Sequence, residues 1–271
     1  MSDDSKVILT RYLYNKTEVK QCLFLSLLEH NMDEALFWGY ELYYSGFEED
    51  TFQFLINIVE TIYLESCAFI VEYTNFIVEN WKQNNSPILF GNFIATLCTK
   101  QYDLKNFCKL YLKIDGQQNH QRDKNRMIVE LDDEYIEKYK TKDINKPETV
   151  LKEKCIYHVK KEINRLFDIL VPNYEELTKL YSQKWLYFAS QTPIWKERID
   201  KYNGVVNDEE NNITFSNEDD EQEFYNKYNY EPDEQTNETM EKMIGKKNID
   251  YYTIKDFCNK YHFQIKTKRR K

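Results

Sequence analysis

Residues 17–46 read TEVKQCLFLSLLEHNMDEALFWGYELYYSG, and this stretch decides the fold class. Its first half is apolar on almost every side, as a helix buried inside a protein must be. Its second half carries large apolar side chains at helical spacing, namely Leu36, Phe37, Tyr40, Tyr43 and Tyr44. We expect Thr17 and Asp33 to be the N-caps, and Gly46 to end the second helix because glycine tolerates positive φ. The short connection between the two helices predicts that they pack antiparallel.

The same pattern continues to about residue 113. Apolar side chains recur at helical spacing over residues 52–62 and 69–81, and Ser86 with Pro87 has the form of an N-cap followed by proline at the first helical position. No fixed repeat period is present, which argues against a solenoid of consensus repeats. The sequence therefore predicts an all-α fold of antiparallel helical hairpins, arranged as a HEAT-like or irregular bundle.

Turn-forming residues are scarce in this chain. Of its 271 residues, 6 are Gly and 5 are Pro, whereas 22 are Tyr, 16 are Phe and 4 are Trp. Loop-built active sites and phosphate loops need glycine for positive φ and close backbone approach. The sequence also lacks a glycine-rich phosphate loop, a Gly-x-Ser-x-Gly elbow, a His-Glu-x-x-His motif and a Cys-x-x-Cys pair. These absences favour a protein that is not an enzyme and that needs no cofactor.

Charge and cysteine usage narrow the class further. The net charge of −9 argues against a protein that coats nucleic acid over its whole surface, although a local basic patch remains possible. No apolar run reaches the roughly 18 residues needed to cross a bilayer, and the first residues do not resemble a signal peptide, so we expect no membrane insertion. The six cysteines lie in apolar helical patterns, which predicts reduced, buried thiols in a cytosol-like compartment.

Composition divides the chain into five blocks. They are an N-terminal helical block (1–114), a polar insertion (115–146), a long-helix block (147–206), an acidic arm (207–235), and a C-terminal helix with a basic tail (236–271). The stretch 207–234 holds eleven acids and one lysine, which predicts a mobile loop or an extended arm.

Within these blocks we predict four elements. Residues 127–131 are expected to form one short strand, and residues 147–170 one long helix. A further helix over 174–190 is expected to end or kink before Pro193, and a last helix covers 254–262.

Basic residues are the first candidate site, for RNA or DNA. A helix over 147–170 places Lys154, His158, Lys161 and Arg165 opposite its apolar face, where they form a ridge for phosphate contacts. The preceding loop adds Arg122, Lys124 and Arg126, and the C-terminal tail adds Lys268, Arg269 and Arg270. A solvated helix face is the simpler interpretation of the ridge. The tail has three alternatives, which are a targeting signal, a contact with the acidic arm and a disordered solubilising end.

Aromatic residues are the second candidate site. Trp38, Tyr40, Tyr43 and Tyr44 are predicted to line an exposed groove between helices that binds a protein partner. Stacking on nucleic-acid bases and ordinary core packing are the alternatives.

Two sets of residues resemble metal ligands, but a metal site is predicted for neither set. Cys155, His158, Cys258 and His262 have ligand types and spacings that suit zinc on helices, but buried thiols and surface histidines explain them more simply. Glu130, Asp132, Asp133 and Glu134 follow the predicted strand, where acids can hold magnesium for phosphoryl transfer. Such a run also favours the start of a helix.

Two parts of the chain resemble a known family. They are RYLY at residues 11–14 with EALFWGYELYYSGF at 34–47, and YEPDEQ at 230–235 with Ile244-Gly245. Together they resemble a family of uncharacterised proteins encoded by large DNA viruses of protists. That family has no assigned activity, so the resemblance implies a context, which is the host cytoplasm, a viral factory or a virion.

The sequence thus predicts a non-enzymatic helical scaffold of a large DNA virus that binds protein partners. One alternative is an RNA- or DNA-binding accessory factor in viral transcription, translation or replication. A metal-dependent nuclease built on Glu130 and Asp132 is the third and least favoured reading.

Overall fold

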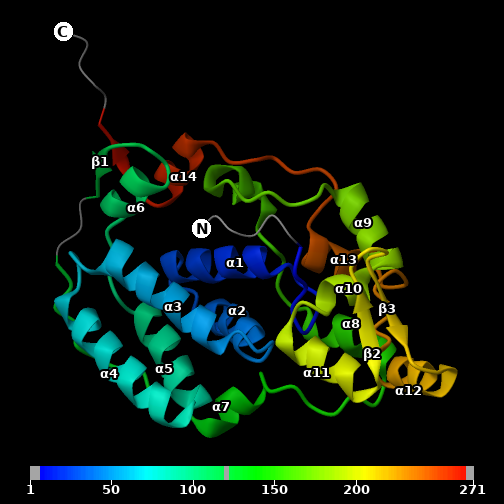
Figure 1. The fold of residues 1–271 in the computed structure, drawn as a ribbon. Helices are drawn as coiled ribbons and strands as arrows, with labels where there is room; N and C mark the ends of the chain where they lie inside the picture. The colour runs from blue at the N-terminus through cyan, green and yellow to red at the C-terminus, as the bar shows by residue number, and fades with distance from the viewer. Residues whose placement is uncertain (1–6, 119–121, 267–271) are drawn as a thin grey trace.

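The computed structural model describes residues 7–118 and 122–266, and this part of the chain is mostly helical (Figure 1). The first elements are α1 (Lys16–Leu28), α2 (Met32–Tyr43), α3 (Glu48–Ile58), the π-helical turn η1 (Val59–Tyr63), α4 (Ala68–Asn84), α5 (Pro87–Cys98) and α6 (Lys105–Leu110). Helix α1 is buried on nearly all sides, as predicted, because it contacts α2, α3 and α5. No helix in the described part of the chain is both long and apolar enough to cross a membrane.

The helix ends agree with the sequence in part. Ser86 caps α5 and Pro87 opens it, as predicted, and Gly46 follows α2 with a φ of 92°. The other two caps were wrong by two residues. Asn15 rather than Thr17 caps α1, and Asn31 rather than Asp33 caps α2, because these amide oxygens accept the free N–H groups of each first turn.

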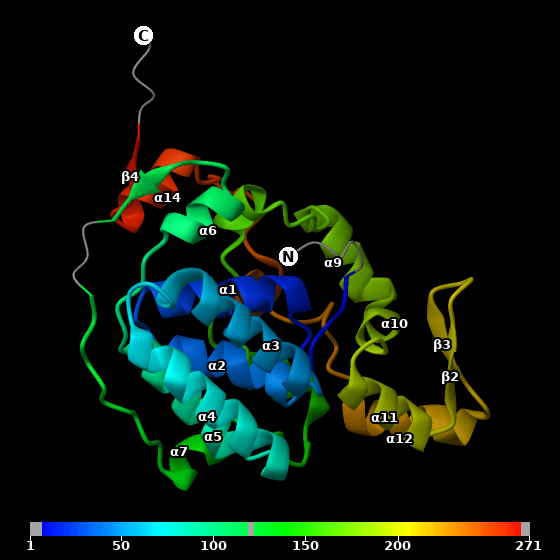
Figure 2. The same ribbon diagram turned by 60° about the vertical axis from the view of Figure 1, so that its left-hand side comes forward.

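The remaining elements are shorter. They are β1 (Gly116–Gln117), α7 (Asp133–Glu137), η2 (Pro147–Thr149), α8 (Val150–Lys154), η3 (Lys161–Phe167), α9 (Tyr174–Gln183), α10 (Trp185–Ala189), α11 (Pro193–Lys201), β2 (Gly204–Asn207), β3 (Asn212–Phe215), α12 (Glu218–Tyr228), α13 (Asn237–Ile244), α14 (Ile254–Lys260) and β4 (Gln264–Ile265). Strands β1 and β4 pair antiparallel, with Gly116 opposite Ile265. Strands β2 and β3 form a hairpin that stands at the edge of the molecule (Figure 2).

The long helix over 147–170 was a wrong prediction. Only the short helices η2, α8 and η3 form there, and residues 155–160 between α8 and η3 are not helical. The backbone of this segment bonds to other elements instead of to itself. Val159 donates its N–H to the carbonyl of Lys242, and the carbonyl of Lys160 accepts from the Gln21 side chain at 2.7 Å. Tertiary partners therefore replace the helical hydrogen bonds.

The extended acidic arm was also wrong over most of its length. Residues 204–215 form the β2–β3 hairpin, and α12 follows. Asn217 caps α12, and four acids in its first turn complement the positive end of the helix dipole. Phe224 and Tyr228 are buried, so this helix also has an apolar face.

The predicted strand over 127–131 does not form. In this segment Val129 donates its N–H to Thr96 Oγ1 at 3.0 Å, and Leu131 donates to Asn92 Oδ1 at 2.8 Å. The segment thus bonds to side chains of α5, which leaves no partner strand for a ladder.

A buried ion pair joins the start of the chain to α2. Arg11 Nε lies 2.9 Å from Glu41 Oε2, and both side chains are almost fully enclosed. The other Glu41 oxygen accepts from Thr10 Oγ1 at 2.6 Å and from the backbone N–H of Tyr12 at 3.0 Å. Arg11 Nη1 donates to the carbonyl of Tyr139 at 2.7 Å. Both charges are therefore compensated by hydrogen bonds.

A second charged cluster joins α1 to the C-terminal part. Glu29 accepts from Lys160 Nζ and Lys260 Nζ, each at 2.7 Å, and from the Tyr261 hydroxyl at 3.2 Å. Burial acts to raise the pKa of Glu29, but the hydrogen bonds from Lys160 and Lys260 outweigh it, so its pKa is lowered.

We predict that Glu41→Gln lowers the free energy of unfolding by about 3–5 kcal/mol, because it leaves the Arg11 charge buried without its counter-ion. Urea unfolding followed by circular dichroism measures this loss. Glu197→Gln is the matched control, since Glu197 is exposed on α11, and it should change stability by less than about 0.5 kcal/mol. Equal effects of the two substitutions would contradict the structural role of the pair.

Glu29→Gln tests the second cluster through its pH dependence. A lowered folded pKa means that Glu29 stabilises the protein fully above its unfolded pKa of about 4.3, and that this contribution is lost as the pH falls through the folded value. Wild type should therefore exceed Glu29→Gln in stability at pH 6, and the difference should shrink towards pH 3. Urea titrations at both pH values measure it. A difference that does not change with pH would contradict the assignment.

Candidate functional site

The predicted aromatic groove does not exist at the predicted residues. Trp38 and Tyr40 are fully buried, Tyr43 is nearly so, and Tyr44 is half-buried. Trp38 Nε1 donates to Glu34 at 3.1 Å, and the Tyr40 hydroxyl donates to the carbonyl of Pro87 at 2.8 Å. The prediction of an exposed partner-binding groove at these residues is wrong, because their rings fill the space between α2, α5 and neighbouring segments.

The predicted basic ridge is also absent. Lys161 is buried and lies 3.3 Å from Glu18 Oε1, whereas the Arg165 guanidinium covers the ring of Tyr251 at 3.5 Å from its centroid. Lys154 lies at the end of α8, where it lines a small pocket together with Tyr139 and Tyr157. The three cations therefore do not share a helix face. Lys268, Arg269 and Arg270 lie outside the described residues.

The candidate zinc and magnesium ligands do not come together either. Cys155 and Cys258 are buried, while His158 and His262 are exposed. Glu130, Asp132, Asp133 and Glu134 are exposed around the start of α7. Across residues 7–118 and 122–266, no group of three or more His, Cys, Asp or Glu side chains is placed to hold a metal ion.

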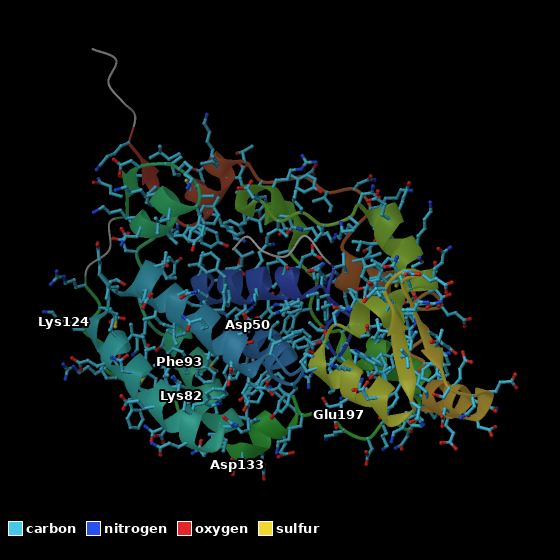
Figure 3. All side chains as sticks on the ribbon, viewed as in Figure 1. Asp50, Lys82, Phe93, Lys124, Asp133 and Glu197 are labelled. Atoms are coloured by element: carbon cyan, nitrogen blue, oxygen red, sulfur yellow. The ribbon has the colours of Figure 1, made fainter. Side chains whose placement is uncertain are left out.

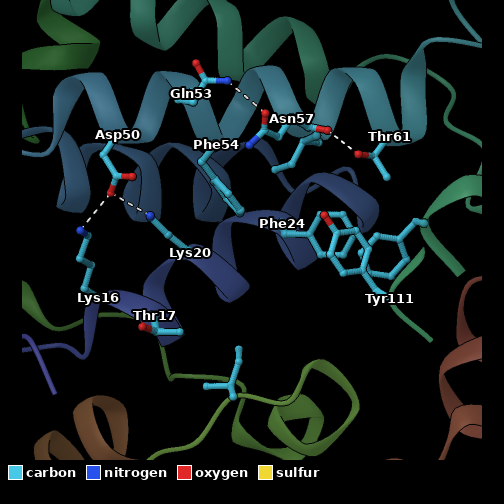
Figure 4. Close-up of a pocket in the computed structure, with 13 residues that line it drawn as sticks. Lys16, Thr17, Lys20, Phe24, Asp50, Gln53, Phe54, Asn57, Thr61 and Tyr111 are labelled. Carbon is cyan, nitrogen blue, oxygen red and sulfur yellow. Dashed lines mark hydrogen bonds and ion pairs between the residues drawn. The ribbon is translucent and has the colours of Figure 1, made fainter. Parts of the chain in front are cut away.

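A groove does lie between helices, at residues that the sequence analysis did not select. It has a volume of about 410 Å³. It lies between α1, α3 and α6, and Ile169, which follows η3, also lines it (Figure 4). Its lining residues are Lys16, Thr17, Lys20, Phe24, Asp50, Gln53, Phe54, Asn57, Ile58, Thr61, Phe107, Tyr111 and Ile169. We call this site the α1/α3/α6 groove.

The floor of the groove is aromatic. The Phe24 and Phe107 rings pack at a centroid distance of 4.7 Å, and Tyr111 lies 5.0 Å from Phe107. Tyr111 is 37% exposed, and its neighbour Leu110 is 56% exposed. Leu170, which follows the lining residue Ile169, is 80% exposed. Exposed apolar side chains therefore flank the lining residues Tyr111 and Ile169 in sequence.

One end of the groove is charged. Asp50 Oδ2 accepts from Lys16 Nζ at 3.0 Å and from Lys20 Nζ at 2.8 Å (Figure 4). Burial acts to raise the pKa of Asp50, but the hydrogen bonds from Lys20 and Lys16 outweigh it and lower the pKa. Two cations facing one anion leave a positive excess. The signal for this end was present in the sequence, because Lys16, Lys20 and Phe24 recur every four residues on one helix face.

The thiols are placed for packing rather than for chemistry. All six cysteines are buried and unpaired, as predicted. Burial raises the pKa of each thiol, so the reactive thiolate is disfavoured.

This burial predicts slow thiol modification in the native protein. Ellman's reagent should label fewer than one thiol per chain under native conditions and all six after unfolding in guanidinium. Absorbance of the released thionitrobenzoate measures both rates. Rapid labelling of a native thiol would show that at least one cysteine is accessible and ionised, and would contradict the burial of all six thiols.

No protein-family model, curated protein or solved structure matches this chain. The function of the α1/α3/α6 groove is therefore inferred from the chemistry of its own residues.

Proposed function

We propose that this protein is a non-enzymatic helical scaffold that binds a segment of a protein partner in the α1/α3/α6 groove. The observation that carries the proposal is a concave surface between helices that combines aromatic and aliphatic side chains with polar ones, with its charged groups confined to one end. Ligand sites typically combine an apolar surface with a few placed polar groups. The surrounding helices, which we infer to form an irregular antiparallel bundle, hold this surface in place.

A peptide segment suits the groove better than an enclosed small molecule. The site is open to solvent along α3, where the lining residues Gln53 and Asn57 are exposed. An amphipathic helix or an extended segment places apolar side chains at regular intervals into such a groove. The positive excess at Lys16 and Lys20 favours a segment that carries an acid next to its apolar anchors.

The proposed setting rests on the family resemblance. The segments 11–14 with 34–47 and 230–235 with Ile244-Gly245 resemble a family of uncharacterised proteins of large DNA viruses of protists. We propose that the scaffold acts in the host cytoplasm, in a viral factory or in the virion of such a virus.

Asn57→Trp tests the groove without disturbing the core. Asn57 is exposed, and its side-chain oxygen accepts only from the exposed Gln53 amide in the described structure, at 3.1 Å. The added indole should fill the groove. Peptides selected on the wild-type protein from a displayed library should therefore bind Asn57→Trp at least about tenfold more weakly, a loss of about 1.4 kcal/mol. Isothermal titration calorimetry measures the affinities.

Gln183→Trp is the matched control, because Gln183 is an exposed residue at the end of α9 that does not line the groove. It adds the same indole and should leave peptide affinity unchanged. Thermal unfolding of both variants checks that the fold is retained. Selected peptides that bind Asn57→Trp as tightly as wild type would show that the groove is not the binding surface.

A further inference from the structure

A second concave surface lies beside the start of α4 and has a different chemistry. It has a volume of about 900 Å³, and its walls include three exposed cations, Arg122, Lys124 and Arg126. Lys124 projects from the edge of the molecule next to α4 (Figure 3). The three residues alternate along a segment without helical structure, and alternate side chains of an extended chain point to the same side. We call residues 122–126 the basic segment.

The basic segment is held firmly against the helices. Asp123 donates its N–H to the carbonyl of Ser66 at 2.8 Å, and its carboxylate accepts the N–H groups of Gln101 at 2.9 Å and Asn125 at 2.7 Å. The buried Lys100 ammonium donates to the carbonyls of Asn125 at 3.1 Å and Met127 at 2.6 Å. These bonds fix the backbone, so the three cations are presented on a rigid support.

In the described residues, no ion pair involves Arg122, Lys124 or Arg126. Three acids, equal in number to the cations, also line the surface, and in the described residues each accepts a hydrogen bond from a neutral N–H group instead of pairing with one of these cations. Asp123 is engaged as described, Asp103 accepts the N–H of Lys105 at 2.8 Å, and Glu65 accepts from Asn106 at 3.4 Å.

Helix α4 adds a positive end and a row of rings. Ala68 and Phe69 of its first turn line the surface, and the N-terminus of a 17-residue helix carries partial positive charge. The Arg126 guanidinium lies 6.0 Å from the Phe69 ring centroid. Phe69 stacks on Tyr73 at 5.9 Å, and Tyr73 stacks on Phe76 at 6.4 Å. Phe76 is 56% exposed, so the row ends on an open ring.

We propose that the basic segment and the α4 ring row bind single-stranded nucleic acid, with Arg122, Lys124 and Arg126 on phosphates and Phe76 stacked on a base. Sequence-tolerant single-strand binders combine cations that contact phosphates with rings that stack on bases. Here the well-exposed ring is Phe76, which lies about two helical turns along α4 from Phe69 beside Arg126. A duplex fits less well, because its bases are stacked inside the helix and cannot reach Phe76. This site is separate from the α1/α3/α6 groove, and the proposal does not depend on the groove.

The test measures fluorescence anisotropy of a labelled oligo(dT) strand of about 15 nucleotides, a length that covers one typical single-strand site. For wild type, three phosphate contacts predict that the logarithm of the association constant falls with the logarithm of salt concentration with a slope of about −2. The triple variant Arg122→Gln, Lys124→Gln, Arg126→Gln should bind at least about tenfold more weakly at low salt and lose most of this slope. Phe76→Ala should weaken binding on the order of tenfold and keep the slope.

A second triple variant controls for net charge. Lys152→Gln, Lys179→Gln and Lys196→Gln remove the same charge from α8, α9 and α11, on the opposite side of the molecule in Figure 1. This variant should bind like wild type, and thermal unfolding confirms that all variants are folded. Three results would overturn the proposal. They are no binding by wild type, equal losses in the two triple variants, and a duplex of the same length that binds as tightly as the single strand.

Discussion

The short segment that precedes α1 is the constraint on which the rest of the structure depends, and the Arg11–Glu41 pair fixes it. The pair is buried, so its desolvation is tolerable only with full hydrogen bonding, and Thr10, Tyr12 and Tyr139 supply that bonding. The carbonyls of the same segment accept donors from distant parts of the chain. Thr192 bonds to Leu9 at 2.6 Å, Trp195 bonds to Thr10 at 3.1 Å, and the Tyr181 hydroxyl bonds to Leu13. Residues 9–13 therefore connect α2 to α9 and α11.

This arrangement also explains the placement of the groove. Asn15, the last residue of that segment, caps α1, so the ion pair and the cap together set where α1 begins. Lys16 and Lys20 follow within the first turns and reach Asp50 on α3. The charged end of the groove is thus connected, through the start of α1, to the buried Arg11–Glu41 pair. An apolar floor and a rigid charged end are what a selective peptide site requires.

The sequence predicted the first half well and the second half poorly, for a physical reason. In α1 to α5 the apolar spacing and the helix agree, because burial on a helix face is what the spacing reports. Residues 155–160 have the same spacing, yet Gln21 and Lys242 bond to their backbone and no helix forms. Propensity cannot anticipate such partners. The location of the groove could not be predicted for the same reason. The sequence predicted a groove lined by rings on and just after α2, whereas the rings of the observed groove belong to α1, α3 and α6 and the residue after α6. Arg122, Lys124 and Arg126 could be named from the sequence because they are charged residues in a polar segment, and their role in nucleic-acid binding stays a prediction.

The two proposed sites meet at η1, and this shapes what the molecule can do. Thr61 of this π-helical turn lines the α1/α3/α6 groove, and Leu64 to Ser66 just after it line the surface beside the basic segment. π-Helical turns are rare and often occur at functional sites. Here the turn is anchored, because Asp103 donates its N–H to the carbonyl of Ile62 at 2.7 Å, and the Tyr63 hydroxyl bonds to Leu97 at 3.2 Å. Because this turn is anchored between two separate surfaces, the two proposals together place a peptide and a nucleic-acid strand on the molecule at the same time.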